Sequence, residues 1–342
     1  MKKIFLKFVM LITCLLFISC EDGKEKIYIY SWAGYIPSTI YENFEKETGI
    51  KIIEDIYSSN EEMYTKIKSG GDGYDLVLPS SDYLEIMSKQ DLLEKLDKSK
   101  LTGLENISDV VFEKMKLSGN ISDYGVPYMM IPTVIAVNKN YVKDYKRDYS
   151  IFDREDLAGR MTMLDDMREI MTVALDVNGY KQDNDSDEAL EAAKKTILNW
   201  KKNIVKFDSE SFGKGFANGD FVVVQGYPDN ISSELTKEQL NDVDFIIPDK
   251  GGFSAIDSLA ILKSSKNKEN AYKFLEYLLR PEVAAEISSI FHIPSINKKA
   301  YEMMDFAPLY NIEDLEKTQV LIDIGPKLYK HNQYWQSILI DN

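Results

Sequence analysis

The amino-acid sequence predicts an α/β protein with two domains. Short apolar strands alternate with helical patterns near the start of the chain, where 26–30 and 50–57 read as strands and 39–48 reads as a helix. Strands and helices that alternate at this spacing form right-handed βαβ units around a mostly parallel sheet. The chain has 342 residues, which is more than one hydrophobic core usually serves, so we expect two domains.

The first 19 residues have the pattern of a secretory signal peptide. Lysines at positions 2, 3 and 7 precede an apolar run, 8–18, and Ser19 stands directly before Cys20. A membrane-spanning helix would need about 20 apolar residues, and this run is shorter. We therefore expect 1–19 to be removed from the mature protein.

The position of Cys20 resembles the lipobox of bacterial lipoproteins, in which the cysteine is acylated and becomes the mature N-terminus. Phe17 stands where that motif usually has a leucine. The resemblance implies that 20–25 is a lipidated tether. The protein would then be periplasmic or extracytoplasmic and anchored to a bacterial membrane by lipidated Cys20.

The composition indicates a strongly acidic mature protein without a disulfide. Of the two cysteines, Cys14 lies in the predicted signal peptide, so no disulfide is expected. The formal charge of −15 becomes −18 when three lysines leave with the signal peptide, with 38 basic against 56 acidic residues. Such a field opposes nucleic acid and anionic substrates and attracts cations, although acidity also serves solubility.

Three loops follow predicted strands in the first part of the chain: 32–35, 58–60 and 79–83. Ligands of open α/β sheets bind beyond the carboxyl ends of the strands. Trp32 and Tyr35 lie in the first of these loops, where aromatic residues are candidates for ligand contact.

Two apolar runs are candidates for strands that connect the domains. The run 129–138 is uncharged, and Pro132 would lie at the crossing. The run 256–262 is apolar except for Asp257 and Ser258. A carboxylate inside such a strand is costly unless it is paired or functional, which favours a functional role for Asp257.

The segment 163–171 combines the end of a strand with the start of a helix, and it carries three carboxylates at the junction. If Asp165 caps the helix, Asp166 and Glu169 lie three residues apart on its first turn and face one direction. Two converging carboxylates predict a cation site. The alternative is structural, because acidic residues also stabilise helix N-termini through the helix dipole.

The sequence contains few groups for catalysis or for cofactor binding. His292 and His331 are the only histidines, and no phosphate-binding glycine loop, zinc-protease motif or nucleophile elbow is present. We expect no catalytic residue, no metal and no cofactor. The alternative from a different class is a secreted carboxylate-dependent hydrolase, since a glycosidase needs only paired Asp or Glu residues.

From Lys26 onward, nearly the whole mature chain resembles the periplasmic spermidine/putrescine-binding proteins of polyamine ABC importers. Each motif is modest alone, and their order along the chain is specific. The motifs occupy 28–32, 35–37, 47–51, 59–64, 74–80, 165–169 and 257–261.

This resemblance implies the two-lobed type II periplasmic-binding-protein fold, with two crossings between the lobes and a ligand clamped by hinge closure. The first lobe would comprise 26–132 and 256–299, and the second 133–255 and 300–342. The expected partners are a small-molecule polyamine, the membrane permease of an ABC importer, and the membrane through the lipid anchor. A monomer that binds no nucleic acid is expected.

The same resemblance implies roles for individual residues. Carboxylates would receive the ammonium groups of the polyamine, while aromatic faces pack on its methylenes and add cation–π attraction. The implied aromatic positions are Trp32, Tyr35 and Tyr227, where Tyr227 stands at a position that is often tryptophan. The implied carboxylates are Asp166, Glu169 and Asp257, and the implied further polar contacts are Ser80, Ser209 and Gln319.

Two departures from the family pattern affect the preferred polyamine. Ala255 stands where a cleft tryptophan is found, and Asp82 stands where a tyrosine is common. If Asp82 faces the cleft without a partner such as Arg168, a fourth carboxylate would favour spermidine at least as much as putrescine. A related binder of another small cationic solute, such as ferric ion or thiamine, is a further alternative, although no adjacent tyrosine pair suited to ferric ion is present.

Overall fold

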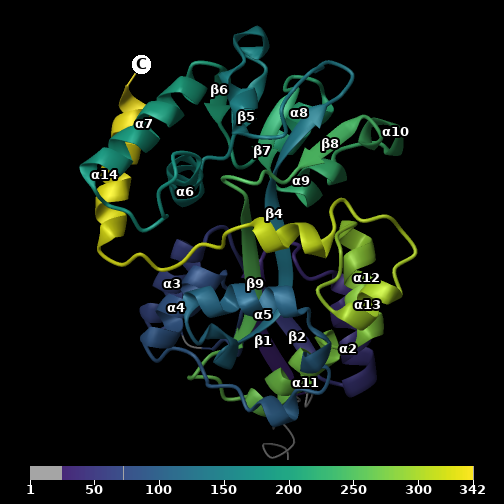
Figure 1. The fold of residues 1–342 in the computed structure, drawn as a ribbon. Coiled ribbons are helices and arrows are strands. Elements are labelled where there is room, and N and C mark those ends of the chain that lie inside the picture. Colours follow the sequence, from purple (N-terminus) through teal and green to yellow (C-terminus); the bar gives the residue numbers. More distant parts are fainter. Residues whose placement is uncertain (1–24, 72, 342) are drawn as a thin grey trace, which may run out of the picture.

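A computed structural model describes residues 25–71 and 73–341, and these residues form two lobes joined at a narrow middle (Figure 1). The predicted signal peptide, Cys20 and most of the tether lie outside the described residues. Within the described chain, no helix has the length and apolar character needed to cross a membrane.

The first lobe is the lower one in Figure 1. It has three parallel strands in the order β2-β1-β3, as the βαβ pattern predicts. Lys26 lies opposite Lys51, and Ile29 lies opposite Leu76. The strands are β1 (Lys26–Trp32), β2 (Lys51–Tyr57) and β3 (Leu76–Val77), and the helices of this lobe are α2 (Ser38–Thr48), α3 (Asn60–Lys68), α4 (Ser81–Lys89), α5 (Asp109–Met115), α11 (Lys268–Leu278), α12 (Pro281–Phe291) and α13 (Lys298–Glu302).

The second lobe repeats this arrangement with β5 between β6 and β7, both parallel to it. Its own core is built around the fully or nearly fully buried rings of Trp200, Phe152 and Trp335. The strands are β5 (Met161–Met163), β6 (Ile204–Phe207), β7 (Val223–Gly226) and β8 (Val243–Ile246), and the helices are α6 (Met167–Val177), α7 (Asp187–Lys201), α8 (Phe212–Ala217), α9 (Pro228–Ser233), α10 (Lys237–Leu240) and α14 (Lys327–Ile340).

Two long strands, β4 (Gly125–Asn138) and β9 (Phe253–Ile261), connect the lobes. They pair antiparallel from Gly125 opposite Ala260 to Thr133 opposite Phe253, after which β4 pairs with β7 and β8 of the second lobe. The change of partners occurs beside Pro132, where the sequence suggested a crossing between the lobes. The parallel pairing predicted from the βαβ pattern holds for β1 with β2 and β3, and for β5 with β6 and β7, whereas the crossing strands β4 and β9 pair antiparallel.

A third passage between the lobes occurs near the C-terminus. The 3-10 turn Ile312–Lys317 packs on α5 of the first lobe and buries Ile312 and Leu315 there. The Tyr310 hydroxyl donates to the Met130 carbonyl at 2.9 Å. The chain thus leaves the first lobe near Thr318, later than the predicted boundary at 300, because these apolar residues are buried against the first lobe. Other 3-10 turns are Lys98–Lys100, Leu104–Asn106, Lys116–Ser118, Ile121–Asp123, Tyr149–Asp153 and Glu155–Leu157.

Candidate functional site

Asp257 is the centre of a group of polar side chains on the first-lobe side. It lies on β9, is 7% exposed, and accepts two short hydrogen bonds. The Ser80 hydroxyl donates to Oδ1 at 2.6 Å, and the Tyr35 hydroxyl donates to Oδ2 at 2.6 Å. Burial raises the pKa of Asp257 to about 6, while these two hydrogen bonds act to lower it. In the described residues no lysine or arginine forms an ion pair with this carboxylate.

Aromatic residues surround this carboxylate. The Tyr35 ring lies 5.7 Å from that of Tyr128 and 6.3 Å from that of Phe291, and the Tyr128 hydroxyl donates to the Tyr35 carbonyl at 3.0 Å. Trp32 ends β1, and its ring packs 4.6 Å from Tyr57. The indole N–H of Trp32 donates to the Leu78 carbonyl at 3.2 Å, which fixes the orientation of the ring. Both predicted aromatic residues are half-buried and held in place by neighbours.

The second group begins at the N-terminus of α6, one residue later than predicted. Asp166, and not Asp165, is the N-cap: its backbone is extended (φ −131°, ψ 107°), and its Oδ1 accepts a hydrogen bond from the Glu169 N–H at 2.9 Å. Asp165 is exposed, and its own N–H donates to the Ser209 hydroxyl at 2.9 Å. Asp166 therefore satisfies a free N–H in the first turn of the helix.

Glu169 is almost fully buried, with 2% of its surface exposed. Its Oε2 accepts from the Thr133 hydroxyl and its Oε1 from the Tyr227 hydroxyl, both at 2.8 Å. Burial, and secondly the charge of Asp166, raise the pKa of Glu169 to about 8. Hydroxyl groups donate hydrogen bonds but supply no positive charge, so the ionised form of Glu169 is disfavoured until a cation approaches.

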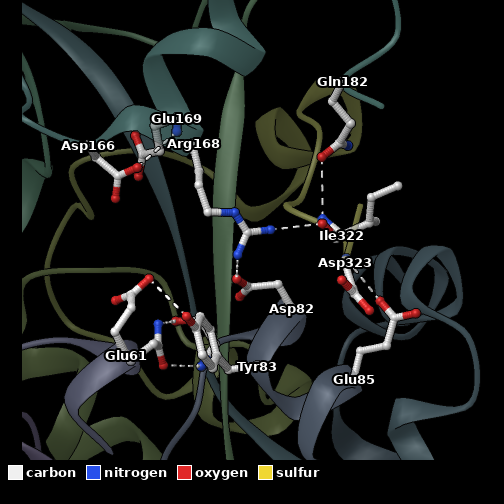
Figure 2. Close-up of polar contacts among 12 residues, drawn as sticks. Glu61, Asp82, Tyr83, Glu85, Asp166, Arg168, Glu169, Gln182, Ile322 and Asp323 are labelled. Carbon is white, nitrogen blue, oxygen red and sulfur yellow. Dashed lines mark hydrogen bonds and ion pairs between the residues drawn. The ribbon is translucent and has the colours of Figure 1, made fainter. Parts of the chain in front are cut away.

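Arg168 joins the two lobes (Figure 2). From α6 its guanidinium forms an ion pair with Asp82 of α4 in the first lobe, and its Nη2 donates to the Ile322 carbonyl at 2.8 Å. The Asp82 residue is only 3% exposed. Burial raises the pKa of Asp82, against the lowering effect of Arg168. Asp82 thus points toward the other lobe, but its charge is already paired with Arg168. It is therefore not a free fourth carboxylate.

The remaining predicted residues lie around these groups. Ser209 is exposed and supports the backbone of Asp165. Gln319 lies beside the start of β9. Its backbone N–H donates to the Gly252 carbonyl, and its backbone carbonyl accepts from the Ser254 N–H, both at 2.8 Å. Cys20, the predicted lipidation site, is outside the described residues. No group of three or more His, Cys, Asp or Glu side chains in the described chain is arranged to hold a metal ion.

The structure also places residues here that the sequence analysis did not select. Thr133 holds Glu169 from the crossing strand, and Asp229 lies two residues after Tyr227. The sequence does contain an indication of Asp229, because this residue follows the apolar strand 221–226 in the same way that Ser80 follows 74–78. Thr133 had no comparable signal, because a threonine within a buried strand is ordinary.

Comparisons with known proteins agree with this arrangement. The family profile described as bacterial extracellular solute-binding protein matches residues 39–312. The spermidine/putrescine-binding periplasmic protein of Escherichia coli (strain K12) is 33% identical over 326 residues, covering 93% of this chain and 92% of the relative. The putrescine-binding periplasmic protein SpuD of Pseudomonas aeruginosa is 32% identical over 296 residues, covering 82% and 81%.

Solved structures give the same result for the fold. The Tp0655 (TpPotD) lipoprotein of Treponema pallidum superposes with a TM-score of 0.87 at 36% identity, covering 92% of this chain and 99% of the other. A spermidine/putrescine ABC transporter substrate-binding protein from Streptococcus pneumoniae superposes with a TM-score of 0.81 at 25% identity, with the same coverage.

Proposed function

The chain belongs to the bacterial extracellular solute-binding protein family, and from that premise we propose that it captures spermidine and/or putrescine between its lobes for delivery to an ABC importer. The observation that carries the proposal is Asp257, a buried carboxylate that is held by two hydroxyl donors and, within 25–71 and 73–341, by no cation. A carboxylate kept in this state is strongly stabilised when an ammonium group arrives.

The placement of the other carboxylates supports a ligand with more than one ammonium group. Asp166 and Glu169 come from α6 of the second lobe, whereas Asp257 comes from β9 on the side of the first lobe. We assign ammonium binding to these three residues. Trp32, Tyr35 and Tyr227 would pack on the methylenes, with Ser80, Ser209 and Gln319 as further polar contacts.

The raised pKa of Glu169 also favours a cationic solute. A cation beside this carboxylate would stabilise its ionised form and drive release of the proton that Glu169 holds near neutral pH. A neutral solute could donate hydrogen bonds to these carboxylates but would supply no positive charge to stabilise the ionised form of Glu169. Binding of a polyamine should therefore release protons at pH 7.

As a member of an extracellular solute-binding family, the protein acts outside the cytoplasm. We propose in addition that it is a monomer, and that Cys20 carries the lipid that holds it on the membrane. The signal-peptide pattern of 1–19 supports this anchor, as does the similarity to the Tp0655 (TpPotD) lipoprotein of Treponema pallidum.

Solute-binding proteins of ABC transporters are not enzymes, and neither the family nor the relatives support the alternative of a carboxylate-dependent hydrolase. The arrangement of Asp166 and Asp257 is accordingly explained as a binding site.

Calorimetric titration tests the proposal directly. We expect heats of binding for putrescine and spermidine, and none for uncharged sugars of similar size. Repeating the titrations in two buffers with different ionisation enthalpies measures the number of protons released. If the protein binds a sugar but neither polyamine, the proposed function is wrong.

A further inference from the structure

Asp229 is a carboxylate with an unsatisfied buried oxygen. It lies in the first turn of α9, two residues after Tyr227, whose hydroxyl holds Glu169. Its Oδ1 is shielded from solvent and has no hydrogen-bond partner among the described residues. An unpaired buried acceptor is costly, so a residue of this kind in a folded protein calls for a compensating ligand or another physical reason.

Asp229 comes from the second lobe and lies close to the Asp257 group. Helix α9 packs on β4, and β4 is the neighbour of β9, where Met129 is opposite Asp257. The negative charge of Asp229 contributes to the raised pKa of both Asp257 and Tyr35. Burial raises the pKa of Asp229 as well, against the lowering effect of hydrogen bonds from the backbone N–H groups of Asp229 and Asn230, and no cation is among the groups that shift it.

A purely structural role explains these facts less well. Acidic residues do stabilise the first turn of a helix, but that benefit is available to an exposed carboxylate and does not require an oxygen to be buried without a partner. In addition, the charge of Asp229 raises the pKa of Asp257, so the two carboxylates oppose rather than stabilise the empty site.

We propose that Asp229 and Asp257 together hold one ammonium group of the bound polyamine, from opposite lobes. Asp166 and Glu169 then receive another ammonium group. An ammonium group has three N–H donors, so it can donate one hydrogen bond to the free Oδ1 of Asp229 and another to Asp257. The inference rests on the proposed function and adds a ligand residue to it.

The arrangement also gives the bound ammonium a role in lobe closure. One cation between carboxylates from the two lobes replaces repulsion by attraction, so the ligand favours the closed arrangement over an open one. The preferred ligands are therefore amines with at least two ammonium groups separated by methylenes, which can satisfy both acidic pairs at once.

The test is titration of the full-length protein and its Asp229→Asn variant with putrescine and spermidine. Asparagine keeps the size of the side chain and removes its charge. We expect affinity for both ligands to fall about 10-fold to 100-fold, the usual effect of losing a hydrogen bond to a charged group. Asp220→Asn is the matched control, because Asp220 is exposed in the same lobe, and its affinity should be that of the unaltered protein.

Thermal unfolding of the empty proteins separates binding from structure. Removal of an uncompensated buried charge should leave the midpoint unchanged or raise it. Affinity within twofold of the unaltered protein, or a variant that fails to fold while Asp220→Asn folds, would overturn the role of Asp229. If the unaltered protein binds neither polyamine, the proposed function itself fails, which is a different result.

Discussion

The carboxylates between the lobes are compensated in different ways when no ligand is bound. Asp82 has the full positive charge of Arg168. Glu169 and Asp257 each have two hydroxyl donors, and Asp229 has a buried oxygen with no partner in the described chain. Hydroxyl donors orient a carboxylate without neutralising it. Substitutions of these residues should therefore have different effects on binding and on stability.

Asp257→Asn should weaken binding of putrescine and spermidine at least about 30-fold. Truncating one partner of a desolvated charge pair costs roughly 2–5 kcal/mol, and 1.4 kcal/mol is about a factor of ten. The Tyr35 and Ser80 hydroxyls can still bond to the amide, so the variant should unfold cooperatively. Calorimetry gives the affinity, with exposed Asp249→Asn as the control.

Near-normal affinity of Asp257→Asn would assign Asp257 to the structure of β9 and remove the main support for the proposed function.

The affinity for polyamines should increase as the pH rises toward about 8. The pKa of Glu169 is raised from 4.5 to about 8, so much of this group is protonated at neutral pH and must lose its proton to bind a cation. Lysine-like amines ionise near pH 10, so the charge of the ligand changes little over this range. Putrescine titrations at several pH values check the expectation, and Glu169→Gln should show a flatter profile.

The stability of the empty protein should change in the opposite direction. Because the folded pKa of Glu169 lies above its unfolded value, the folded state binds more protons, and the free energy of unfolding falls as pH rises through about 8. Denaturant unfolding at about pH 7 and pH 8.5 measures this change. An equal decrease in Glu169→Gln would mean that another group is responsible.

At the scale of elements, α6 and α4 carry the contact that holds the lobes together. Arg168 projects from the first turn of α6 toward Asp82 in the first turn of α4, and it also binds the Ile322 carbonyl in the third passage between the lobes (Figure 2). Nearby, the Asp323 N–H donates to Glu85 of α4 at 3.2 Å. The C-terminal passage therefore lies beside the contact between the two helices and takes part in it.

Asp82→Asn should destabilise the protein and weaken polyamine binding. Breaking a buried ion pair costs about 3–5 kcal/mol, and we expect the lower end because the lobes can separate and expose Arg168 to water. The unpaired guanidinium would also repel the ligand, and spermidine, with three positive charges, more than putrescine with two. Thermal unfolding and titration with both ligands measure the two effects.

Two further variants make this prediction specific. Glu113→Gln breaks an exposed pair with Lys116 and should cost no more than about 1 kcal/mol. Combining Asp82→Asn with Arg168→Gln removes both charges and should recover part of the lost affinity. If Asp82→Asn instead binds both ligands as the unaltered protein does, the ion pair has no influence on the site.

At the scale of the whole molecule, we propose that the lobes act as a clamp and that lipidated Cys20 attaches the protein to the membrane. We expect Cys20→Ala to release the protein from membranes or to leave its precursor uncleaved, because lipidation needs the cysteine thiol. Detergent partitioning and the mass of the mature N-terminus measure this. Cys14→Ala is the control, since that residue lies in the predicted signal peptide and should have no effect. Unchanged processing and partitioning of Cys20→Ala would contradict the anchor.

Much of the fold follows from local patterns. The alternation of apolar strands with helices in 26–78 predicted parallel βαβ units, and β1, β2 and β3 have that pairing. The uncharged run 129–138 predicted a strand between the lobes, and β4 changes partners after Thr133. Asp257 was selected because a carboxylate within an apolar strand is unusual whatever the tertiary structure. These properties depend on neighbours in the sequence, so the sequence by itself determined them.

The tertiary structure decided which of the carboxylates are free to bind a cation. Asp82 and Arg168 are 86 residues apart, and Tyr35 and Asp257 are 222 residues apart, so no local pattern shows that the first pair is an ion pair and the second a hydrogen bond. The unpaired oxygen of Asp229 likewise becomes evident only when α9 is packed on β4. Burial and pairing are properties of surfaces brought together by the whole path of the chain, and these set the charge available to a ligand.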